Sequence, residues 1–256
     1  NLIVYDFPDP TKMFLANLNS DSITEPKTIS ENSKKDDISI PTVTEFQFFD
    51  HQKEAIKSWI SNDMCGLFEM ATGTGKTITA FGCISELQKL HNRTVIVIAC
   101  PYKHLVEQWK TEFDKFNSKV DLNDKISFEK TIICNGDYPK WKVQFNNMIF
   151  DFNEIPLGGK IPIMNQIIIF ITHDTLASPD FISRLEKLTN TKKFLIIDEV
   201  HEITENRSSK VLLDEYEFRL GLSATPNRHM DEEGTQILKN YFHSSKCFGT
   251  DVSDEK

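Results

Sequence analysis

A glycine-bearing loop between a predicted strand and a predicted helix carries the residues best suited to chemistry. It comprises Thr72, Gly73, Thr74, Gly75, Lys76 and Thr77. Glycine adopts positive φ without steric cost, so the backbone can approach a ligand closely. Amide groups in such a loop and at a helix N-terminus attract anions. We therefore predict that the loop encloses a polyphosphate, with Lys76 at the terminal phosphates and the Thr77 hydroxyl on Mg²⁺.

The loop departs from the general phosphate-loop pattern at one position. That pattern opens with a glycine where Met70 stands here. A flexible surface loop before an amphipathic helix is the alternative interpretation, and such a loop would do no chemistry. Because a motif of this kind is a hypothesis until its context agrees, the interpretation depends on the motifs that follow.

Two adjacent carboxylates, Asp198 and Glu199, follow a short apolar stretch at residues 194–197. At the end of a buried strand they would be costly to ionise unless a cation or water shared the site. In parallel α/β sheets, ligands bind beyond the carboxyl ends of the strands. We predict that Asp198 reaches Mg²⁺ through water and that Glu199 orients and deprotonates the water that attacks the γ-phosphate. The alternative is an acidic turn before a helix N-terminus, where carboxylates suit the helix dipole.

A third segment, residues 219–226, ends a predicted strand in hydroxyl-bearing side chains. Gly221 and Ser223 resemble the start of a nucleophile elbow, but Thr225 stands where that motif needs a second glycine. We expect Ser223 and Thr225 to form hydrogen bonds around the acidic pair. A Ser/Thr turn before proline is the alternative.

The composition limits the class of protein. The chain has 256 residues and a net charge of −9, which argues against a generic basic nucleic-acid-binding domain. A local groove can still be positive on an acidic protein. The five cysteines form no C-x-x-C pair, and we expect free thiols in the core of a cytoplasmic protein. No apolar run reaches the ~20 residues of a membrane span, so we expect no membrane partner.

Strands and helices alternate from residue 46 onward. The apolar patterns predict strands at 66–70, 94–99, 131–134, 167–172, 194–197 and 216–223, and helices at 51–60, 76–90, 102–117, 140–151, 178–189 and 232–242. Such alternation indicates an α/β fold with a mostly parallel sheet and helices on both faces. Residues 1–44 differ, because their stretch 18–41 is almost without large apolar side chains and is predicted to be a linker. The apolar beginning of that segment is compatible with the tail of an upstream domain or with a packed strand.

Several segments, in this order, resemble the motifs of superfamily 2 helicases and translocases. Residues 71–77, 198–201 and 223–225 resemble motifs I, II and III, residues 49–52 are similar to the adenine-reading segment, and residues 99–109 and 171–176 are similar to nucleic-acid-binding segments including motif Ia. The resemblance covers about residues 46–249. Segments 68–70 and 105–109 most resemble the branch found in type I and type III restriction enzymes and in DNA repair translocases.

The resemblance implies a RecA-like P-loop fold, ATP and Mg²⁺ as cofactors, and roles for particular residues. The residues given catalytic roles are Lys76, Asp198, Glu199 and His201. Ser223 and Thr225 would couple ATP hydrolysis to the closure of the two lobes. Nucleotide contacts fall on Gln52 and the loop 72–77, with Thr77 and Asp198 as metal ligands. Nucleic-acid contacts fall on Pro101, Tyr102, Lys103 and Thr172. We expect double-stranded DNA rather than RNA as the partner.

The sequence departs from the family in three ways. Phe49 stands where many relatives carry arginine, and Val200 replaces the commoner alanine of motif II. Motifs IV to VI, with the arginine fingers, are not within residues 45–256, which we interpret as the first helicase lobe. We therefore expect the chain to be a piece of a longer protein, with the second lobe in cis and nearly no activity alone. A neighbouring nuclease or methyltransferase domain or subunit would fit the restriction branch.

Three other interpretations remain from the sequence. An ATPase of another P-loop family would need a different acidic motif. A nucleotide-dependent regulatory module that binds nucleic acid without turnover is opposed by an intact Glu199. A structural domain would leave the three motifs unexplained. The sequence leaves open DNA or RNA, unwinding or translocation, and polarity.

Overall fold

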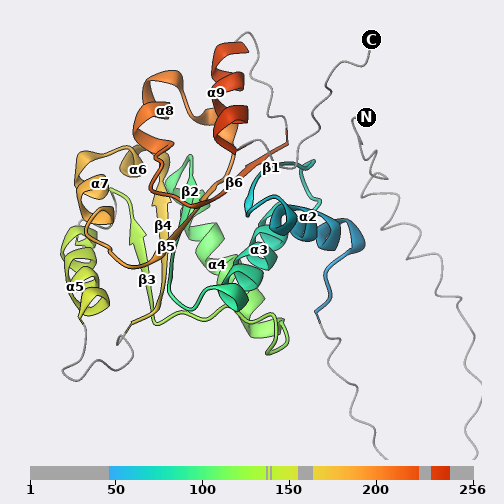
Figure 1. Cartoon of the computed structure of the whole chain (residues 1–256), viewed down its shortest axis with the longest axis horizontal. Coiled ribbons are helices and arrows are strands. Elements are labelled where there is room, and N and C mark those ends of the chain that lie inside the picture. Colours follow the sequence, from blue (N-terminus) through green and yellow to red (C-terminus); the bar gives the residue numbers. More distant parts are fainter. Residues whose placement is uncertain (1–45, 137, 139, 155–163, 225–231, 243–256) are drawn as a thin grey trace, which may run out of the picture. The chain divides into compact units, whose positions relative to one another are not determined.

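Figure 1 shows the computed structural model of the chain, which describes residues 46–136, 138, 140–154, 164–224 and 232–242. These residues all belong to one unit, Phe46–Gly249. The N-terminal segment and linker predicted at residues 1–44 lie outside the described residues.

A six-stranded sheet forms the centre of this unit, with the order β1-β6-β5-β2-β4-β3. The strands are β1 (Cys65–Glu69), β2 (Thr94–Cys100), β3 (Lys130–Cys134), β4 (Gln166–Thr172), β5 (Lys192–Ile197) and β6 (Phe218–Ser223). Every pair of neighbouring strands is parallel. All strands therefore present their carboxyl ends at the same edge of the sheet, and the α/β prediction is confirmed.

Helices cover both faces of the sheet (Figure 1). One face packs on α2 (Asp50–Ser61), α3 (Lys76–Leu90) and α4 (Lys103–Lys119). The other packs on α5 (Trp141–Asn153), α6 (His173–Leu176), α7 (Pro179–Leu185), α8 (Glu205–Val211) and α9 (Glu232–Phe242). A 3₁₀ turn, η1 (Val200–Glu202), follows β5.

The apolar strands divide their side chains between these two layers. In β2, Val95 and Val97 belong to the cluster with α5 and α7, whereas Ile96 and Ile98 belong to the cluster with α3 and α4. Successive strand residues point to opposite faces, so a strand buried on both sides needs a continuous apolar run. All seven residues of β2, and all seven of β4, are buried.

The predicted elements agree with the structure except at a few ends. The helix predicted at 178–189 ends at Leu185, and the strand predicted at 216–223 begins only at Phe218. Tyr216 is nonetheless buried, because the chain enters the core before it joins the sheet. The sequence patterns did not indicate α6, η1 or α8, which are short and have weak apolar periodicity.

The prediction of free thiols in the core is confirmed for the part of the chain that the structure describes. Cys65, Cys83, Cys100 and Cys134 are free and buried, while Cys247 lies outside the described residues. Burial raises the pKa of the Cys83 and Cys100 thiols, which disfavours their nucleophilic thiolate form. Within the described residues, the structure contains no helix that is long and apolar enough to cross a membrane.

We expect Phe194→Ala to lower the free energy of unfolding by about 3–5 kcal/mol, the usual cost of emptying a buried phenylalanine site. Phe194 has no exposed surface, and its ring centroid lies 4.9 Å from that of Trp59. Phe150→Ala is the matched control, because Phe150 is 69% exposed and its loss should change stability by less than about 0.5 kcal/mol. Urea denaturation measures both, and similar losses would contradict this description of the core.

Candidate nucleotide-binding site

The predicted phosphate loop connects the end of β1 to the start of α3, and its backbone has the conformation that glycine permits. Gly73 and Gly75 have φ of 84° and 86°. A Cβ on Gly73 would meet no described atom within 4 Å, whereas a Cβ on Gly75 would lie 2.4 Å from Gln52 Nε2. The loop therefore opens to free space at Gly73 and packs closely on α2 at Gly75.

The N-terminus of α3 is prepared for an anion. Its N-cap residue is Gly75, which has no side chain to accept hydrogen bonds from the first-turn amides. Those amides and the helix dipole favour a negative group. Thr77 is half-buried in the first turn, beside the place where such a group would bind. These features of the loop fit a bound phosphate.

Lys76 connects the loop to the acidic pair. Its Nζ donates a hydrogen bond to the carbonyl of Met70 at 3.2 Å and lies 4.0 Å from Glu199 Oε1. The Lys76 side chain is 11% exposed and that of Glu199 is 32% exposed, so the pair lies at the edge of the solvent. The structure thus brings together two motifs that are more than a hundred residues apart in sequence.

Asp198 follows β5 directly and is 9% exposed. Both of its carboxylate oxygens are held, since Trp109 Nε1 donates to Oδ2 at 2.8 Å and the Glu199 amide donates to Oδ1 at 3.0 Å. Burial raises the pKa of the Asp198 carboxyl, and the hydrogen bond from Trp109 opposes that rise. A cation near a buried carboxylate favours its charged form, so this position suits a bound cation.

Glu199 has a φ of 45°, which is rare for a residue with a side chain. Such strain persists where the surrounding structure imposes it, and it is common at functional sites. His201 Nδ1 lies 3.5 Å from Glu199 Oε2 and shares a hydrogen bond of 3.0 Å with Ser223 Oγ. The acidic turn and the end of β6 are therefore joined by side chains.

Ser223 also joins the phosphate loop, because β6 lies between β1 and β5. Its carbonyl accepts a hydrogen bond of 3.0 Å from the Met70 amide. Gly221 is explained by packing rather than by a nucleophile elbow, since a Cβ there would lie 2.7 Å from the Leu67 side chain. Thr225, the other predicted coupling residue, lies outside the described residues.

The predicted adenine-reading segment lies at the start of α2, against the loop. Gln52 is 2% exposed; its Oε1 accepts from the Phe49 amide at 3.0 Å, and its Nε2 lies 3.5 Å from the carbonyls of Thr74 and Gly75. His51 Nε2 is hydrogen-bonded to the Thr74 carbonyl at 3.1 Å. Phe49 is 64% exposed and its ring stacks on that of His51. An exposed aromatic surface therefore adjoins the loop at the position where many relatives carry arginine.

The residues predicted to contact nucleic acid lie at the ends of β2 and β4. Cys100 of β2 pairs with Thr172 of β4, so Pro101, Tyr102 and Lys103 follow directly beside Thr172. Tyr102 is 52% exposed, but Thr172 is 6% exposed. The Thr172 hydroxyl is bonded to Thr175 Oγ1 at 2.8 Å and caps α6, which leaves little of it for a ligand.

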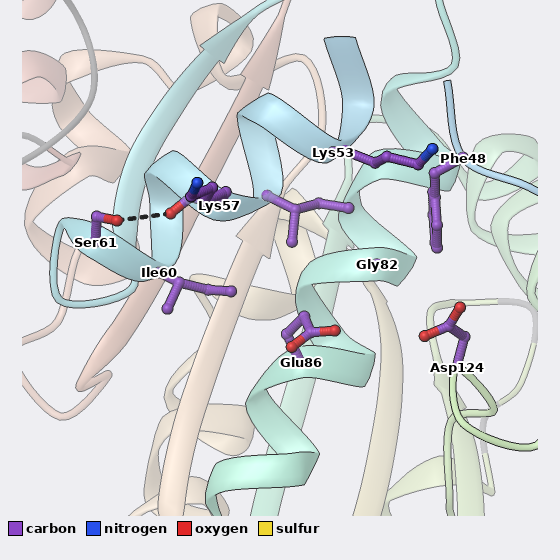
Figure 2. A pocket seen from close by; sticks show the side chains of 9 residues that line it. Phe48, Lys53, Lys57, Ile60, Ser61, Gly82, Glu86 and Asp124 are labelled. Atoms are coloured by element: carbon purple, nitrogen blue, oxygen red, sulfur yellow. Dashed lines mark hydrogen bonds between the residues drawn. The ribbon is translucent and has the colours of Figure 1, made fainter. Parts of the chain in front are cut away.

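A hollow of about 340 Å³ lies elsewhere, between α2 and α3 (Figure 2). It is lined by Phe48, Lys53, Ile56, Lys57, Ile60, Ser61, Gly82, Glu86 and Asp124. None of the predicted site residues is in this set, so the hollow is separate from the candidate site.

The donor set fits Mg²⁺ bound together with a nucleotide. In the described part of the chain, no cluster of three or more histidine, cysteine, aspartate or glutamate residues could hold a metal by itself. Mg²⁺ is commonly bound by one or two protein oxygens, phosphates and water, and Asp198 and the Thr77 hydroxyl could supply the protein oxygens.

Sequence reasoning missed the contact between Trp109 and Asp198. Trp109 falls within the helix predicted at 102–117, but that pattern indicates no partner, and the two residues are 89 positions apart. The available signal was general: a buried indole N–H usually finds an acceptor, but the sequence does not say which one.

The free energy of unfolding of the wild-type chain should rise relative to that of Asp198→Asn as the pH falls from 7 toward about 4, the ordinary aspartate pKa. Burial raises the folded-state pKa, so ionised Asp198 destabilises the fold and its protonation removes that cost. Denaturant titrations across this pH range measure the difference. Asp50→Asn is the control, because its side chain is 98% exposed. A difference that stays constant with pH would contradict the prediction.

Comparisons with known proteins agree with this geometry. Residues 45–228 match the family described as "Type III restriction enzyme, res subunit". The chain is 27% identical over 196 residues to "Putative helicase 22" of Sulfolobus islandicus filamentous virus, isolate Iceland/Hveragerdi. That match covers 75% of this chain and 30% of the viral protein, so the chain spans less than a third of its relative.

Solved structures share the fold at low identity. A nuclease-deletion mutant of the Type ISP restriction-modification enzyme LlaGI, in complex with a DNA substrate mimic, has a TM-score of 0.55 at 20% identity, over 73% of this chain and 19% of that one. The Sulfolobus solfataricus SWI2/SNF2 ATPase core in complex with dsDNA has a TM-score of 0.51 at 16% identity, and the match covers 80% of this chain and 38% of that one. The UvsW helicase from Bacteriophage T4 has a TM-score of 0.51 at 16% identity, and the match covers 78% of this chain and 59% of that one.

The family match covers well over half of the chain, and the parallel sheet carries motifs I and II at its carboxyl edge in the expected order. The chain therefore belongs to the family of type III restriction enzyme res subunits and has the fold of the first RecA-like lobe of superfamily 2 helicases.

Proposed function

We propose that the chain is the ATP-binding lobe of an ATP-dependent nucleic-acid helicase or double-stranded DNA translocase, which hydrolyses ATP with Mg²⁺ when joined to a second lobe. The observation that carries this proposal is the 4.0 Å approach of Lys76 Nζ to Glu199 Oε1. A cation at the phosphate loop and a carboxylate beyond β5 then border the same space. Hydrolysis needs such an arrangement, because the terminal phosphate and the attacking water must be held next to each other.

The loop and Lys76 bind the phosphates. Lys76 exchanges its hydrogen bond with the Met70 carbonyl for bonds to the β- and γ-phosphates, while the amides at the start of α3 donate to the same oxygens. Thr77 and Asp198 are the protein groups that would hold Mg²⁺, which when bound neutralises charge on the phosphates. Gln52 and the exposed Phe49 ring adjoin the loop and are the candidates for contact with the base.

Glu199 acts on the water. Its side chain is 32% exposed and close to Lys76, so it can accept a proton from a water that lies against the terminal phosphate. His201 stands beside it and is hydrogen-bonded to Ser223. Ser223 in turn contacts the phosphate loop through its carbonyl. These contacts connect the phosphate loop and the acidic turn to the end of β6. We assign the coupling of ATP hydrolysis to lobe closure to this strand end, with Ser223 and Thr225.

Pro101, Tyr102 and Lys103 are the candidates for binding a phosphodiester backbone, and Thr172, whose hydroxyl caps α6, lies beside them. Contacts to the phosphodiester backbone carry no sequence information. The preference for double-stranded DNA draws on the LlaGI and SWI2/SNF2 structures, which hold DNA or its mimic. We place a second lobe with its arginine finger in the same polypeptide and a nuclease or methyltransferase partner beside it. The buried free thiols suit a cytoplasmic protein.

Two substitutions in the full-length protein test this function. Lys76→Ala should lower ATP affinity by about 10- to 100-fold, the value of a hydrogen bond to a charged group. Glu199→Gln should leave ATP affinity near that of wild type and lower kcat by about 10²–10⁴-fold. Fluorescent-nucleotide titration and DNA-stimulated phosphate release measure the two quantities.

Lys57→Ala is the control for these measurements, since Lys57 is exposed on α2 and lines the separate hollow. ATP binding without hydrolysis by the wild-type protein, with or without duplex DNA, would contradict the proposed enzyme and favour a regulatory nucleotide-binding module.

A further inference from the structure

The indole of Trp109 is buried and contacts Asp198, the first residue of the acidic pair. Trp109 is 3% exposed and donates its only N–H to Asp198 Oδ2 at 2.8 Å. Because the Glu199 amide holds Oδ1, the plane of the Asp198 carboxylate is set by two donors on opposite oxygens. Each oxygen retains a lone pair, so the carboxylate can still accept from a water or bind a cation in that fixed orientation.

Trp109 is itself held by the helix that follows the phosphate loop. Its ring makes an edge-to-face contact with Phe81 of α3, with centroids 5.5 Å apart and an angle of 87°. Phe81 has no exposed surface. The indole therefore lies between α3, which begins with Lys76, and Asp198, which follows β5. Partners of this kind orient the carboxylates that bind metals, and their removal commonly weakens metal binding.

The same residue belongs to the helix that starts at the candidate nucleic-acid edge. α4 begins at Lys103, directly after Tyr102, and Trp109 is about 9 Å farther along at 1.5 Å per residue. The helix backbone thus connects the candidate nucleic-acid edge to the indole and to the carboxylate bonded to it. Any energetic coupling along this route acts equally in both directions.

We propose that Trp109 is a positioning residue that orients Asp198 for Mg²⁺–nucleotide binding and links that carboxylate, through α4, to contacts at the start of the helix. This inference rests on the proposed function and adds a partner for its metal-binding carboxylate. A purely structural role is the competing explanation. Trp59 offers the comparison, because it is also buried and its Nε1 donates to a backbone carbonyl, that of Arg219, at 3.0 Å.

The experiment compares Trp109→Phe with Trp59→Phe in the full-length protein. A fluorescent ATP analogue is titrated with and without Mg²⁺, and the ratio of the two Kd values gives the affinity gained from the metal. Trp109→Phe should reduce that gain by about 10- to 100-fold while Mg²⁺-free binding stays unchanged. Trp59→Phe should keep the wild-type gain. DNA-stimulated kcat should fall only in Trp109→Phe.

A gain equal to that of wild type in Trp109→Phe, or equal losses in both variants, would overturn the inference. If Trp109→Phe does not fold, 3-benzothienylalanine at position 109 repeats the test, since it keeps the ring shape and lacks the N–H donor. Failure of the proposed function is distinguishable, because it shows in the wild-type protein. Mg²⁺-dependent nucleotide binding without hydrolysis there would contradict the enzyme alone, whereas absence of Mg²⁺-dependent nucleotide binding would overturn both proposals.

Discussion

The approach of Lys76 to Glu199 is the interaction on which the account of this chain depends. A single 4.0 Å separation places the cation of the phosphate loop opposite the carboxylate beyond β5. It requires two independent local structures, a loop with glycines in the left-handed region and a glutamate strained to positive φ. It also requires a sheet in which the strands before the loop and before the glutamate end at the same edge. A different strand order would separate them, and the same residues would then have no common ligand.

The parallel sheet meets that requirement because every strand ends at the same edge. β6 separates β1 from β5, and Ser223 uses this place to contact the loop through its carbonyl and His201 through its hydroxyl. The same edge continues to β2 and β4, where the candidate nucleic-acid residues stand. α4 begins at this edge, directly after β2, and its residue Trp109 donates a hydrogen bond to Asp198. The candidate nucleotide site and the candidate nucleic-acid edge therefore lie at the same edge of one sheet.

The sequence predicted most of this framework because its signals are local. The glycine loop and following apolar positions define α3, whose bounds match the predicted helix. The apolar run at 94–99 predicts a strand buried on both faces, and β2 extends one residue farther, to Cys100. Contacts between distant segments could not be predicted in the same way. Gln52 contacts the loop backbone, and Trp109 finds its acceptor 89 residues away. Each depends on side-chain geometry that only the assembled fold defines.

The most direct test is an experimental structure of the protein with Mg²⁺ and a non-hydrolysable ATP analogue. The account predicts that the γ-phosphate lies between Lys76 and Glu199, with the loop amides on the phosphates and Asp198 on the metal side. A nucleotide bound elsewhere, for example in the hollow between α2 and α3, or a γ-phosphate far from Glu199, would contradict it.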